Sequence, residues 1–179
     1  MIAAVVLAAG QGRRFRGGIK QLHPVGGVPM VERALAAVAG AGIGERIVVL
    51  GAHAGDILAN VDLHGARAVV CDTWRDGQAA SLHAGLAALP ADADRALIVL
   101  GDGPALDPSA VARMAEATPG TRVLAADYGA GRSHPVVIPR ALWDEIPWHG
   151  ETPVRPLGAD LVDCRDLRPP GDVDYAPSS

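Results

Sequence analysis

The sequence predicts a single α/β domain over residues 1–179, with helices flanking a mainly parallel sheet. Apolar runs of strand length alternate with segments of helical period, which is the pattern of successive β-α-β units. A chain of 179 residues is one domain of ordinary size, and no internal repeat, linker or low-complexity tract divides it. The chain is long enough to bury a full hydrophobic core.

The individual elements follow from the apolar runs and from the residues that cap them. Strands are expected over residues 2–7, 46–50, 66–71, 96–100 and 121–126, and helices over 29–39, 54–60, 77–89 and 108–117. Asp107 is a favourable N-cap for the last of these helices, and Pro108 suits its first turn. Pro90 ends the helix over 77–89, because proline cannot continue it.

The regular alternation stops after Gly129. Prolines interrupt residues 135–156, so we expect no further strand or helix of ordinary length there. A substrate-facing insertion is expected in this segment. The chain then returns to a short extended pair around residues 160–164 and 167.

Composition excludes several classes of protein. Apolar residues make up 49% and charged residues 20% of the chain, and the net charge is −4, which argues against disorder and against a nucleic-acid partner. The apolar start over residues 2–9 has no basic stretch before it and leads into a turn, so it predicts a strand and not a signal peptide. No stretch approaches the roughly 20 continuous apolar residues of a membrane-spanning helix. We therefore expect a cytoplasmic protein with no membrane partner.

A glycine-rich turn follows the first predicted strand. Residues 7–20 hold four glycines and four cationic side chains, and glycine lets backbone N–H groups approach a ligand closely. This combination predicts a cradle for a polyphosphate. It is not a Walker A loop, because no Gly-Lys-Ser/Thr follows, and it is a poor dinucleotide fingerprint, because Phe15 stands at the third glycine position. The alternative is a solvated basic loop.

Two further segments carry groups suited to a ligand. Ser81 and free N–H groups at the start of the helix over 77–89 would favour an anion or a base edge, although an ordinary capped helix has the same sequence features. Asp102 directly follows the strand over 96–100, at the edge where open α/β sheets bind ligands, and is the best candidate metal ligand. A turn-forming role beside glycine and proline is the alternative for Asp102.

Two carboxylates stand near the end of the chain, at Asp172 and Asp174. Residues two apart on an extended segment share a face, so both can point the same way. A second carboxylate would complete an oxygen site for a divalent cation that Asp102 alone cannot make. A solvated acidic tail is the alternative.

Together these segments resemble the nucleotidyltransferases of the molybdenum-cofactor cytidylyltransferase type, the MobA-like family. Its first signature, Leu-Ala-Ala-Gly-x-Ser/Gly-x-Arg-Met/Phe with a later Lys, is matched by Leu7, Ala8, Ala9, Gly10, Gly12, Arg14, Phe15 and Lys20. Its Trp-x-x-Gly-Met-x-x-Ser-Leu segment is matched at Trp74, Gly77, Ser81 and Leu82, with Gln78 in place of Met. Its Gly-Asp-Gln-Pro turn is matched at Gly101, Asp102 and Pro104, with Gly103 in place of Gln.

The resemblance implies a three-layer Rossmann-like nucleotidyltransferase fold and a Mg²⁺-dependent reaction. A nucleoside monophosphate would pass from a nucleoside triphosphate to a phosphorylated acceptor such as the molybdopterin cofactor, with release of pyrophosphate. Ala9, where the related guanylyltransferases have a second glycine, implies CMP as the transferred group. A transient contact with a molybdoenzyme or its chaperone would fit the same resemblance.

The resemblance also implies roles for single residues. Arg14, Lys20 and Asp102 would be catalytic, and Asp102 and Asp174 would hold Mg²⁺, because the family ends in Asp-Val/Ile-Asp-Thr-Pro. The nucleotide would be bound by Leu7, Ala8, Ala9, Gly10, Gly12, Arg14, Lys20, Gly77, Ser81 and Asp102. Residues 131–135 and 150–155 are similar to the family's Gly-x-x-Gly-His-Pro and Gly-Asp-x-Gly-Ala-Arg, which implies acceptor contacts for His134 and Arg155. A buried, hydrogen-bonded role is the alternative for His134.

Two other functions are compatible with the sequence. Ser133, Glu151 and Pro153 depart from the family's two acceptor motifs. These departures and Gly103 fit an NAD(P)H-dependent reductase that has reused the fold, because the turn after the first strand could also hold a dinucleotide pyrophosphate. They fit a non-catalytic nucleotide-binding relative as well.

Overall fold

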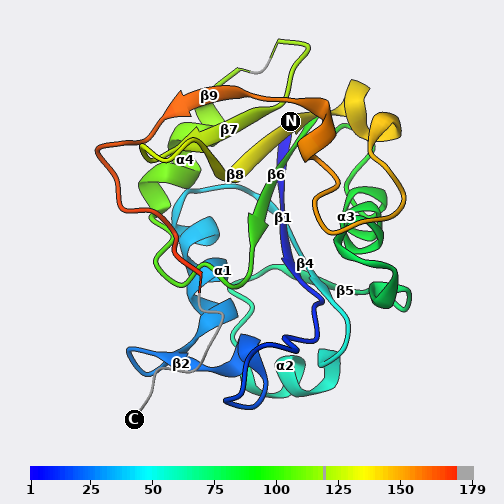
Figure 1. Ribbon diagram of the computed structural model, residues 1–179, viewed down its shortest axis with the longest axis vertical. Helices are drawn as coiled ribbons and strands as arrows, with labels where there is room; N and C mark the ends of the chain where they lie inside the picture. The colour runs from blue at the N-terminus through cyan, green and yellow to red at the C-terminus, as the bar shows by residue number, and fades with distance from the viewer. Residues whose placement is uncertain (119, 173–179) are drawn as a thin grey trace.

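A mixed β-sheet forms the centre of the molecule (Figure 1). The structure, a computed structural model, describes residues 1–118 and 120–172, and within them seven strands stand in the order β5-β4-β1-β6-β8-β7-β9. They are β1 (Ile2–Ala8), β4 (Glu45–Leu50), β5 (Arg67–Val70), β6 (Arg95–Leu100), β7 (Leu124–Asp127), β8 (Arg132–Pro139) and β9 (Asp160–Asp163). Neighbours among β5, β4, β1 and β6 run parallel, as do β7 and β9, whereas β8 is antiparallel to both β6 and β7.

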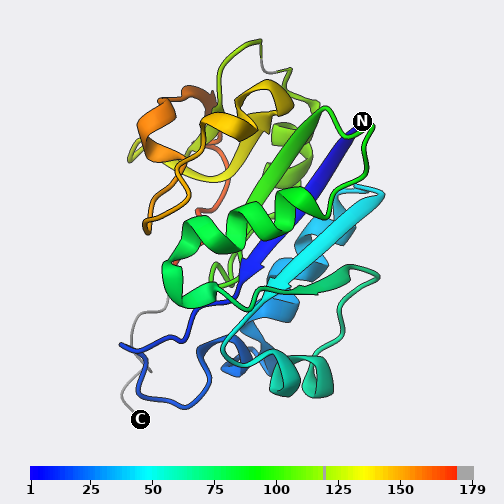
Figure 2. The same ribbon diagram turned by 90° about the vertical axis from the view of Figure 1, so that its right-hand side faces the viewer.

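Helices cover both faces of the sheet. α1 (Met30–Gly40), α2 (Ala54–Asn60) and α4 (Pro108–Glu116) contribute to the core on one face, and α3 (Gln78–Ala87) contributes to the core on the other. Figure 2 shows α3 lying across the strands, with α1 behind them. This three-layer arrangement confirms the predicted α/β fold class. No helix in the described part of the chain combines the length and the apolar surface that a bilayer crossing needs.

β1 is buried on both faces, which explains its continuous apolar sequence. Val6 faces the core beneath α1 and α4, whereas its neighbour Val5 faces the core beneath α3. Gly85 lets α3 lie close to this strand, because a Cβ at that position would come 2.5 Å from Cγ1 of Val5. The turn that follows β1 therefore starts from a strand that is packed tightly on both sides.

The expectation of an irregular segment after residue 129 is wrong for its first part. Residues 132–139 form β8, which lies between β6 and β7. Its ladder with β7 shifts register, so that Ser133 and Val136 are paired and the intervening His134 and Pro135 are skipped. A proline has no N–H to donate, and the skipped position requires none, so the strand tolerates it.

The expectation is confirmed for the residues that follow. Two short 3₁₀ helices, Arg140–Glu145 and Arg155–Leu157, are the regular elements described between β8 and β9. The extended pairing expected near residue 160 is present as β9, which lies beside β7 at the edge of the sheet.

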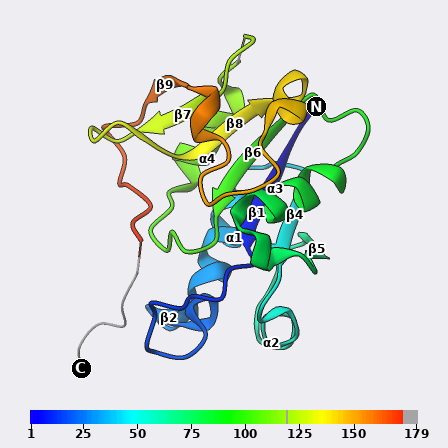
Figure 3. The same cartoon turned by 45° about the vertical axis from the view of Figure 1, so that its right-hand side comes forward.

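A small hairpin between the glycine-rich turn and α1 is not among the predicted elements. A 3₁₀ turn (Lys20–Leu22) leads into β2 (Pro24–Val25) and β3 (Val28–Pro29), and Figure 3 shows this hairpin at the start of α1, apart from the main sheet. Gly26 and Gly27 have φ values of 62° and 82°, as a two-residue hairpin turn requires. Two glycines between two valines are the sequence signal that indicates it.

Candidate functional site

The carboxyl ends of β1 and β6 border a cleft of about 740 Å³. Its walls come from the glycine-rich turn, the start of α3, the turn after β6, and residues 151, 152 and 172. The volume lies within the roughly 300–1,000 Å³ of small-molecule sites. The residues predicted to bind a nucleotide all line this cleft: Leu7, Ala8, Ala9, Gly10, Gly12, Arg14, Lys20, Gly77, Ser81 and Asp102. Their role in binding stays a prediction.

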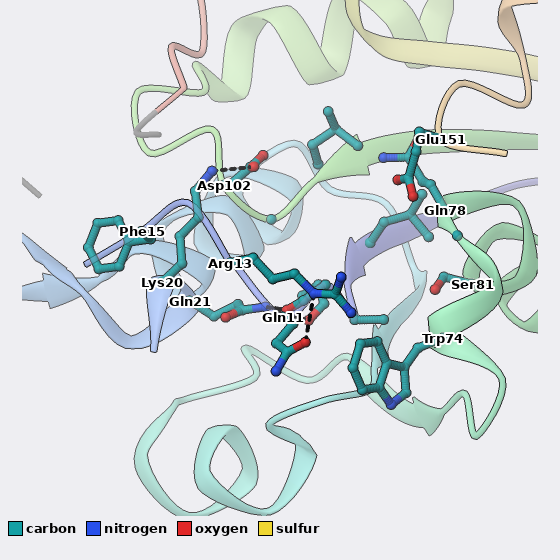
Figure 4. A pocket seen from close by; sticks show the side chains of 18 of the residues that line it. Gln11, Arg13, Phe15, Lys20, Gln21, Trp74, Gln78, Ser81, Asp102 and Glu151 are labelled. Atoms are coloured by element: carbon teal, nitrogen blue, oxygen red, sulfur yellow. Dashed lines mark hydrogen bonds and ion pairs between the residues drawn. The ribbon is translucent and has the colours of Figure 1, made fainter. Parts of the chain in front are cut away.

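The two ends of the cleft offer different chemical groups (Figure 4). Lys20 and Asp102 face each other at one end. Gln78 and Glu151 lie together at the other end, and Arg13 reaches in between. One end, called the charged end below, therefore combines an ammonium with carboxylates, and the other combines the amide of Gln78 with the carboxylate of Glu151.

Lys20 is held between two carboxylates. Its Nζ donates to Oδ2 of Asp102 and to Oδ1 of Asp172, each at 2.9 Å. Burial by itself would lower the pKa of Lys20, but the hydrogen bonds and negative charges of Asp102 and Asp172 outweigh burial and raise that pKa above its ordinary value. Lys20 is therefore a permanent positive charge at the charged end of the cleft.

The glycine-rich turn packs directly against Lys20 and Gln21. Gly12 has a φ of 64°, and a Cβ there would come 2.9 Å from Cβ of Lys20. Buried Gln21 donates from Nε2 to the carbonyl oxygens of Ala8 and Gly10, which ties the start of the turn to the 3₁₀ helix. Gln21 is not among the predicted site residues, and its place directly after Lys20 is the signal that could have indicated it.

A loop from the second half of the chain covers the start of α3. Gly77 has a φ of 103°, and a Cβ there would come 2.9 Å from the carbonyl oxygen of Gly150. That oxygen accepts a hydrogen bond of 3.0 Å from the N–H of Ala79. The expectation of free N–H groups at this helix start is therefore wrong for Ala79. The same loop brings Glu151 and Thr152 into the wall of the cleft, and neither is among the predicted site residues.

A second cavity of about 320 Å³ adjoins the cleft. Leu100, Asp102 and Asp172 line both cavities, so the two carboxylates stand at the boundary between them. Ser133, His134 and residues 169–171 complete the described wall of the second cavity. The structure thus brings His134 close to the same carboxylates as Lys20.

His134 packs against Gly103. A Cβ at Gly103 would come 2.8 Å from Cε1 and 3.0 Å from Nε2 of His134, so the glycine makes room for the imidazole. Burial lowers the pKa of His134 to about 4, and the charges of Asp102 and Asp172 oppose this shift only in part. The imidazole is therefore neutral near pH 7. Its buried Nδ1 has no hydrogen-bond partner among the described residues. The alternative role of His134, a buried and hydrogen-bonded histidine, is therefore not supported at this nitrogen.

Two predicted site residues are not among the described residues that line the cleft or the second cavity. Arg155 begins the second 3₁₀ helix and lines neither of the two cavities formed by the described residues. Its carbonyl oxygen accepts a hydrogen bond from Arg132. Asp174 lies outside the described residues. The acceptor contact of Arg155 and the metal contact of Asp174 stay predictions.

The described residues hold no cluster of three or more His, Cys, Asp or Glu side chains that could bind a metal ion by itself. Two carboxylates, Asp102 and Asp172, do converge on one positive charge, the ammonium of Lys20. Mg²⁺ keeps several waters and is usually bound by one or two carboxylates together with substrate phosphates. This donor set therefore fits a divalent cation that binds together with a phosphate ligand.

Comparisons with known proteins give the family of the chain. The family described as the MobA-like NTP transferase domain matches residues 4–162. A curated relative named nicotine blue oxidoreductase, from Paenarthrobacter nicotinovorans, is 32% identical over 188 residues, which cover 97% of this chain and 92% of the relative.

Solved structures extend the match to three dimensions. The crystal structure of Rv0371c from Mycobacterium tuberculosis H37Rv superposes with a TM-score of 0.82 at 30% identity, covering 97% of this chain and 93% of that one. A second structure of Rv0371c is a complex with manganese, with a TM-score of 0.77 at 30% identity and coverage of 90% and 88%. A nucleotidyl transferase from Methanothermobacter thermautotroptrophicus gives a TM-score of 0.75 at 32% identity, with coverage of 88% and 80%. The chain therefore belongs to the MobA-like NTP transferase domain family of nucleotidyltransferases.

Proposed function

We propose that this chain is a Mg²⁺-dependent nucleotidyltransferase that moves CMP from CTP to a phosphorylated small-molecule acceptor, such as the molybdopterin cofactor, and releases pyrophosphate. The observation that carries the proposal is the meeting of Lys20, Asp102 and the glycine-rich turn in one cleft. Membership of the family supports nucleotidyl transfer as the reaction class. The charged end of the cleft supports a triphosphate as the ligand.

The proposed reaction is an in-line substitution at phosphorus. A phosphate oxygen of the acceptor attacks the α-phosphorus of the triphosphate, the bond from that phosphorus to its bridging oxygen breaks, and pyrophosphate leaves with the electron pair. The attacking oxygen is already ionised at neutral pH. The reaction therefore needs positioning and charge neutralisation more than a general base.

The residues of the cleft would supply that positioning. Arg14 and Lys20 would hold the triphosphate through charge-assisted hydrogen bonds, and backbone N–H groups of the glycine-rich turn would cradle its phosphates. Asp102 and a carboxylate of the tail would hold Mg²⁺, which when bound neutralises phosphate charge as a Lewis acid. The manganese complex of the related Rv0371c supports a divalent cation as a ligand.

Cytosine is the proposed base. Ala9 lies in the wall of the cleft, and its carbonyl oxygen accepts a hydrogen bond of 3.2 Å from the N–H of Ala52. Gly51 packs behind it, because a Cβ there would come 2.6 Å from the same oxygen. In the proposal, this fixed backbone stands close to the edge of the base, which would suit a pyrimidine better than a purine. Initial rates with CTP and GTP side by side test the preference, and equal or reversed rates contradict it.

The acceptor is proposed to bind in the second cavity. Asp102 and Asp172 line both cavities, so a phosphate that enters beside His134 would reach the carboxylates at the boundary. Arg155 is the other proposed acceptor contact. With a molybdopterin-type acceptor, the product would pass on through a transient contact with a molybdoenzyme or its chaperone.

An NAD(P)H-dependent reductase is the second candidate function. It is favoured by the relative from Paenarthrobacter nicotinovorans, which carries the name of an oxidoreductase and matches nearly the whole chain. The glycine-rich turn would then bind the pyrophosphate of a dinucleotide. Gly103, which leaves the turn after β6 without a side-chain amide, fits this candidate as well.

Ligand binding separates the two candidates. Thermal-shift titrations with CTP, GTP, ATP and NADPH are run with and without Mg²⁺. A Mg²⁺-dependent shift with a triphosphate supports the transferase, and a shift with NADPH alone contradicts it in favour of the reductase. Pyrophosphate release with CTP and a phosphorylated acceptor then measures the transfer itself, and binding without release would indicate a non-catalytic relative.

A further inference from the structure

Lys20 is the only lysine in this chain, and the other fifteen side chains counted as Lys or Arg are all arginine. The two residue types are not interchangeable. The ammonium of lysine is a compact point charge on a flexible stem, whereas the guanidinium of arginine is a planar fork that binds two oxygens side by side. A small, movable charge is therefore the property that distinguishes position 20 from every arginine position.

The ammonium of Lys20 bridges two carboxylates from distant parts of the chain. Asp102 follows β6 and Asp172 lies near the end of the described residues, yet Nζ is 2.9 Å from an oxygen of each. The side chain of Lys20 is 11% exposed, compared with 36% for Asp102 and 57% for Asp172, so it is the most buried of the three side chains. Without a cation between them the two negative charges would repel each other.

We propose that the ammonium of Lys20 occupies the position between Asp102 and Asp172 where a divalent cation would bind. It excludes the cation from this position until a triphosphate binds. The same two oxygens cannot hold the ammonium and a divalent cation together, because two positive charges would then meet at one point. A triphosphate in the glycine-rich turn offers the ammonium another anionic partner and frees the carboxylates. In this assignment Asp172 takes the place predicted for Asp174. The identity of the triphosphate rests on the proposed function, whereas the exclusion of the cation by Lys20 does not.

The position of the lysine stem supports such an exchange. A Cβ at Gly12 would come 2.9 Å from Cβ and 3.8 Å from Cδ of Lys20, so the stem lies along the glycine-rich turn. The ammonium therefore stands at the border between the proposed phosphate cradle and the two carboxylates. In the proposed exchange, rotation about the bonds of the stem would move it from one partner to the other. Cation and triphosphate would then bind as a pair, and each would bind weakly alone.

The test is the binding of Mn²⁺ without any nucleotide, measured by electron paramagnetic resonance of the free ion. Wild-type protein should bind Mn²⁺ weakly, and Lys20→Met should bind it about tenfold more tightly or better, because the competing charge is gone. Lys20→Arg keeps a positive charge and should stay weak. In the Lys20→Met background, Asp172→Asn should abolish the gain, which assigns that carboxylate to the cation.

Arg13→Met is the matched control. It removes one positive charge from the same cleft, but Nε of Arg13 donates to Gln11, so the change in Mn²⁺ affinity should be about twofold at most in ordinary salt. Equal or weaker Mn²⁺ binding by Lys20→Met overturns the proposal, and so does equal tightening by Arg13→Met. Melting curves of each variant accompany the titrations.

A measurement on the wild-type protein decides the case if Lys20→Met does not fold. Because the chain has one lysine, its side-chain ammonium gives a single resonance in a ¹⁵N-resolved spectrum. Mg²⁺ alone should leave this resonance in place, and Mg²⁺ with a non-hydrolysable triphosphate analogue should shift it. A shift with Mg²⁺ alone overturns the proposal, as does an unmoved resonance when the analogue is bound. A failure of nucleotidyl transfer would instead contradict the proposed function and leave both binding results intact.

Discussion

The two adjoining cavities differ chiefly in charge. The main cleft has four cationic side chains in its wall: Arg13, Arg14, Lys20 and Arg75. The described wall of the second cavity contains no lysine or arginine, and its histidine is neutral near pH 7. The cationic side chains of the main cleft would therefore favour the triphosphate there, and the second cavity offers an acceptor its two carboxylates and a neutral imidazole. The carboxylates shared by both walls mark where the two ligands would react.

The largest effect is expected at this shared boundary. Asp102→Asn removes a charge on which both ligands depend, so nucleotidyl transfer should fall by about two orders of magnitude or more. Asp172→Asn should be comparably severe, and the double variant scarcely worse than either, because groups that act as a unit are not additive. Pyrophosphate release and melting temperature are measured in parallel.

Two outcomes would change this interpretation. If Asp102 only forms a turn, its variant should lose thermal stability and keep most of its rate. Asp174→Asn is the comparison for the tail. We expect it to be milder than Asp172→Asn, and the reverse order would return the metal contact to Asp174.

A smaller effect, confined to the main cleft, is expected from Arg14→Ala. The loss of one charge-assisted contact should weaken CTP binding by roughly 1.5–3 kcal/mol. Arg14 is exposed, so the melting temperature should change little. Calorimetric titration with CTP checks the affinity, and His134→Ala should leave that affinity unchanged. Undiminished CTP binding by Arg14→Ala would remove the phosphate-cradle interpretation.

Gly103→Ala should act through two residues that line the second cavity. The added Cβ would come within 2.8 Å of the imidazole of His134 and 3.0 Å of Pro170, which should destabilise the fold. Overpacking of this kind typically costs about 1–3 kcal/mol. His134→Ala removes one of the two neighbours, so the double variant should be less destabilised than the two single changes predict together. Urea unfolding gives the free energy of unfolding of the two single variants and the double variant. Strictly additive changes would show that the contact between residues 103 and 134 does not affect stability.

A separate effect is expected in the pH dependence of stability. An unfolded histidine takes up a proton near pH 6.5, whereas His134 in the folded protein does so only near its pKa of about 4. Between these values the unfolded state binds more protons, so the free energy of unfolding should fall as the pH falls from about 6.5 to 4. His134→Gln should remove this part of the slope in urea titrations at several pH values. Identical slopes for both proteins would show that His134 titrates alike in the two states.

The main cleft could be predicted because its groups follow directly from strands. Gly10 and Asp102 come just after apolar runs, and the carboxyl ends of parallel strands share one edge of a sheet. The sequence therefore indicated both the residues and their convergence. Local sequence carried enough information here because the parallel sheet itself brings the segments together.

The rest depends on contacts between distant segments. The sequence indicates that a carboxylate of the tail joins Asp102, but not that Asp172 binds Lys20, since this contact depends on the path of the chain after β9. β8 was missed because Pro135 argues against a strand until the register shift that accommodates it is known. The loop that caps Ala79 from Gly150 is likewise a tertiary contact without a local signal.

The direction of β8 has a consequence for how this scaffold can diversify. Because β8 runs against β6 and pairs Val136 with Ile98, its first residues, and not its last, extend toward the second cavity. The proposed acceptor side therefore includes the first residues of β8, directly after the hairpin turn between β7 and β8, whereas the proposed phosphate side is formed by turns between parallel strands and helices. A hairpin tip can be exchanged in length and sequence while the neighbouring parallel register stays fixed. Exchanging residues 128–135 between relatives would accordingly change the acceptor that is bound and leave the proposed phosphate-binding residues unchanged.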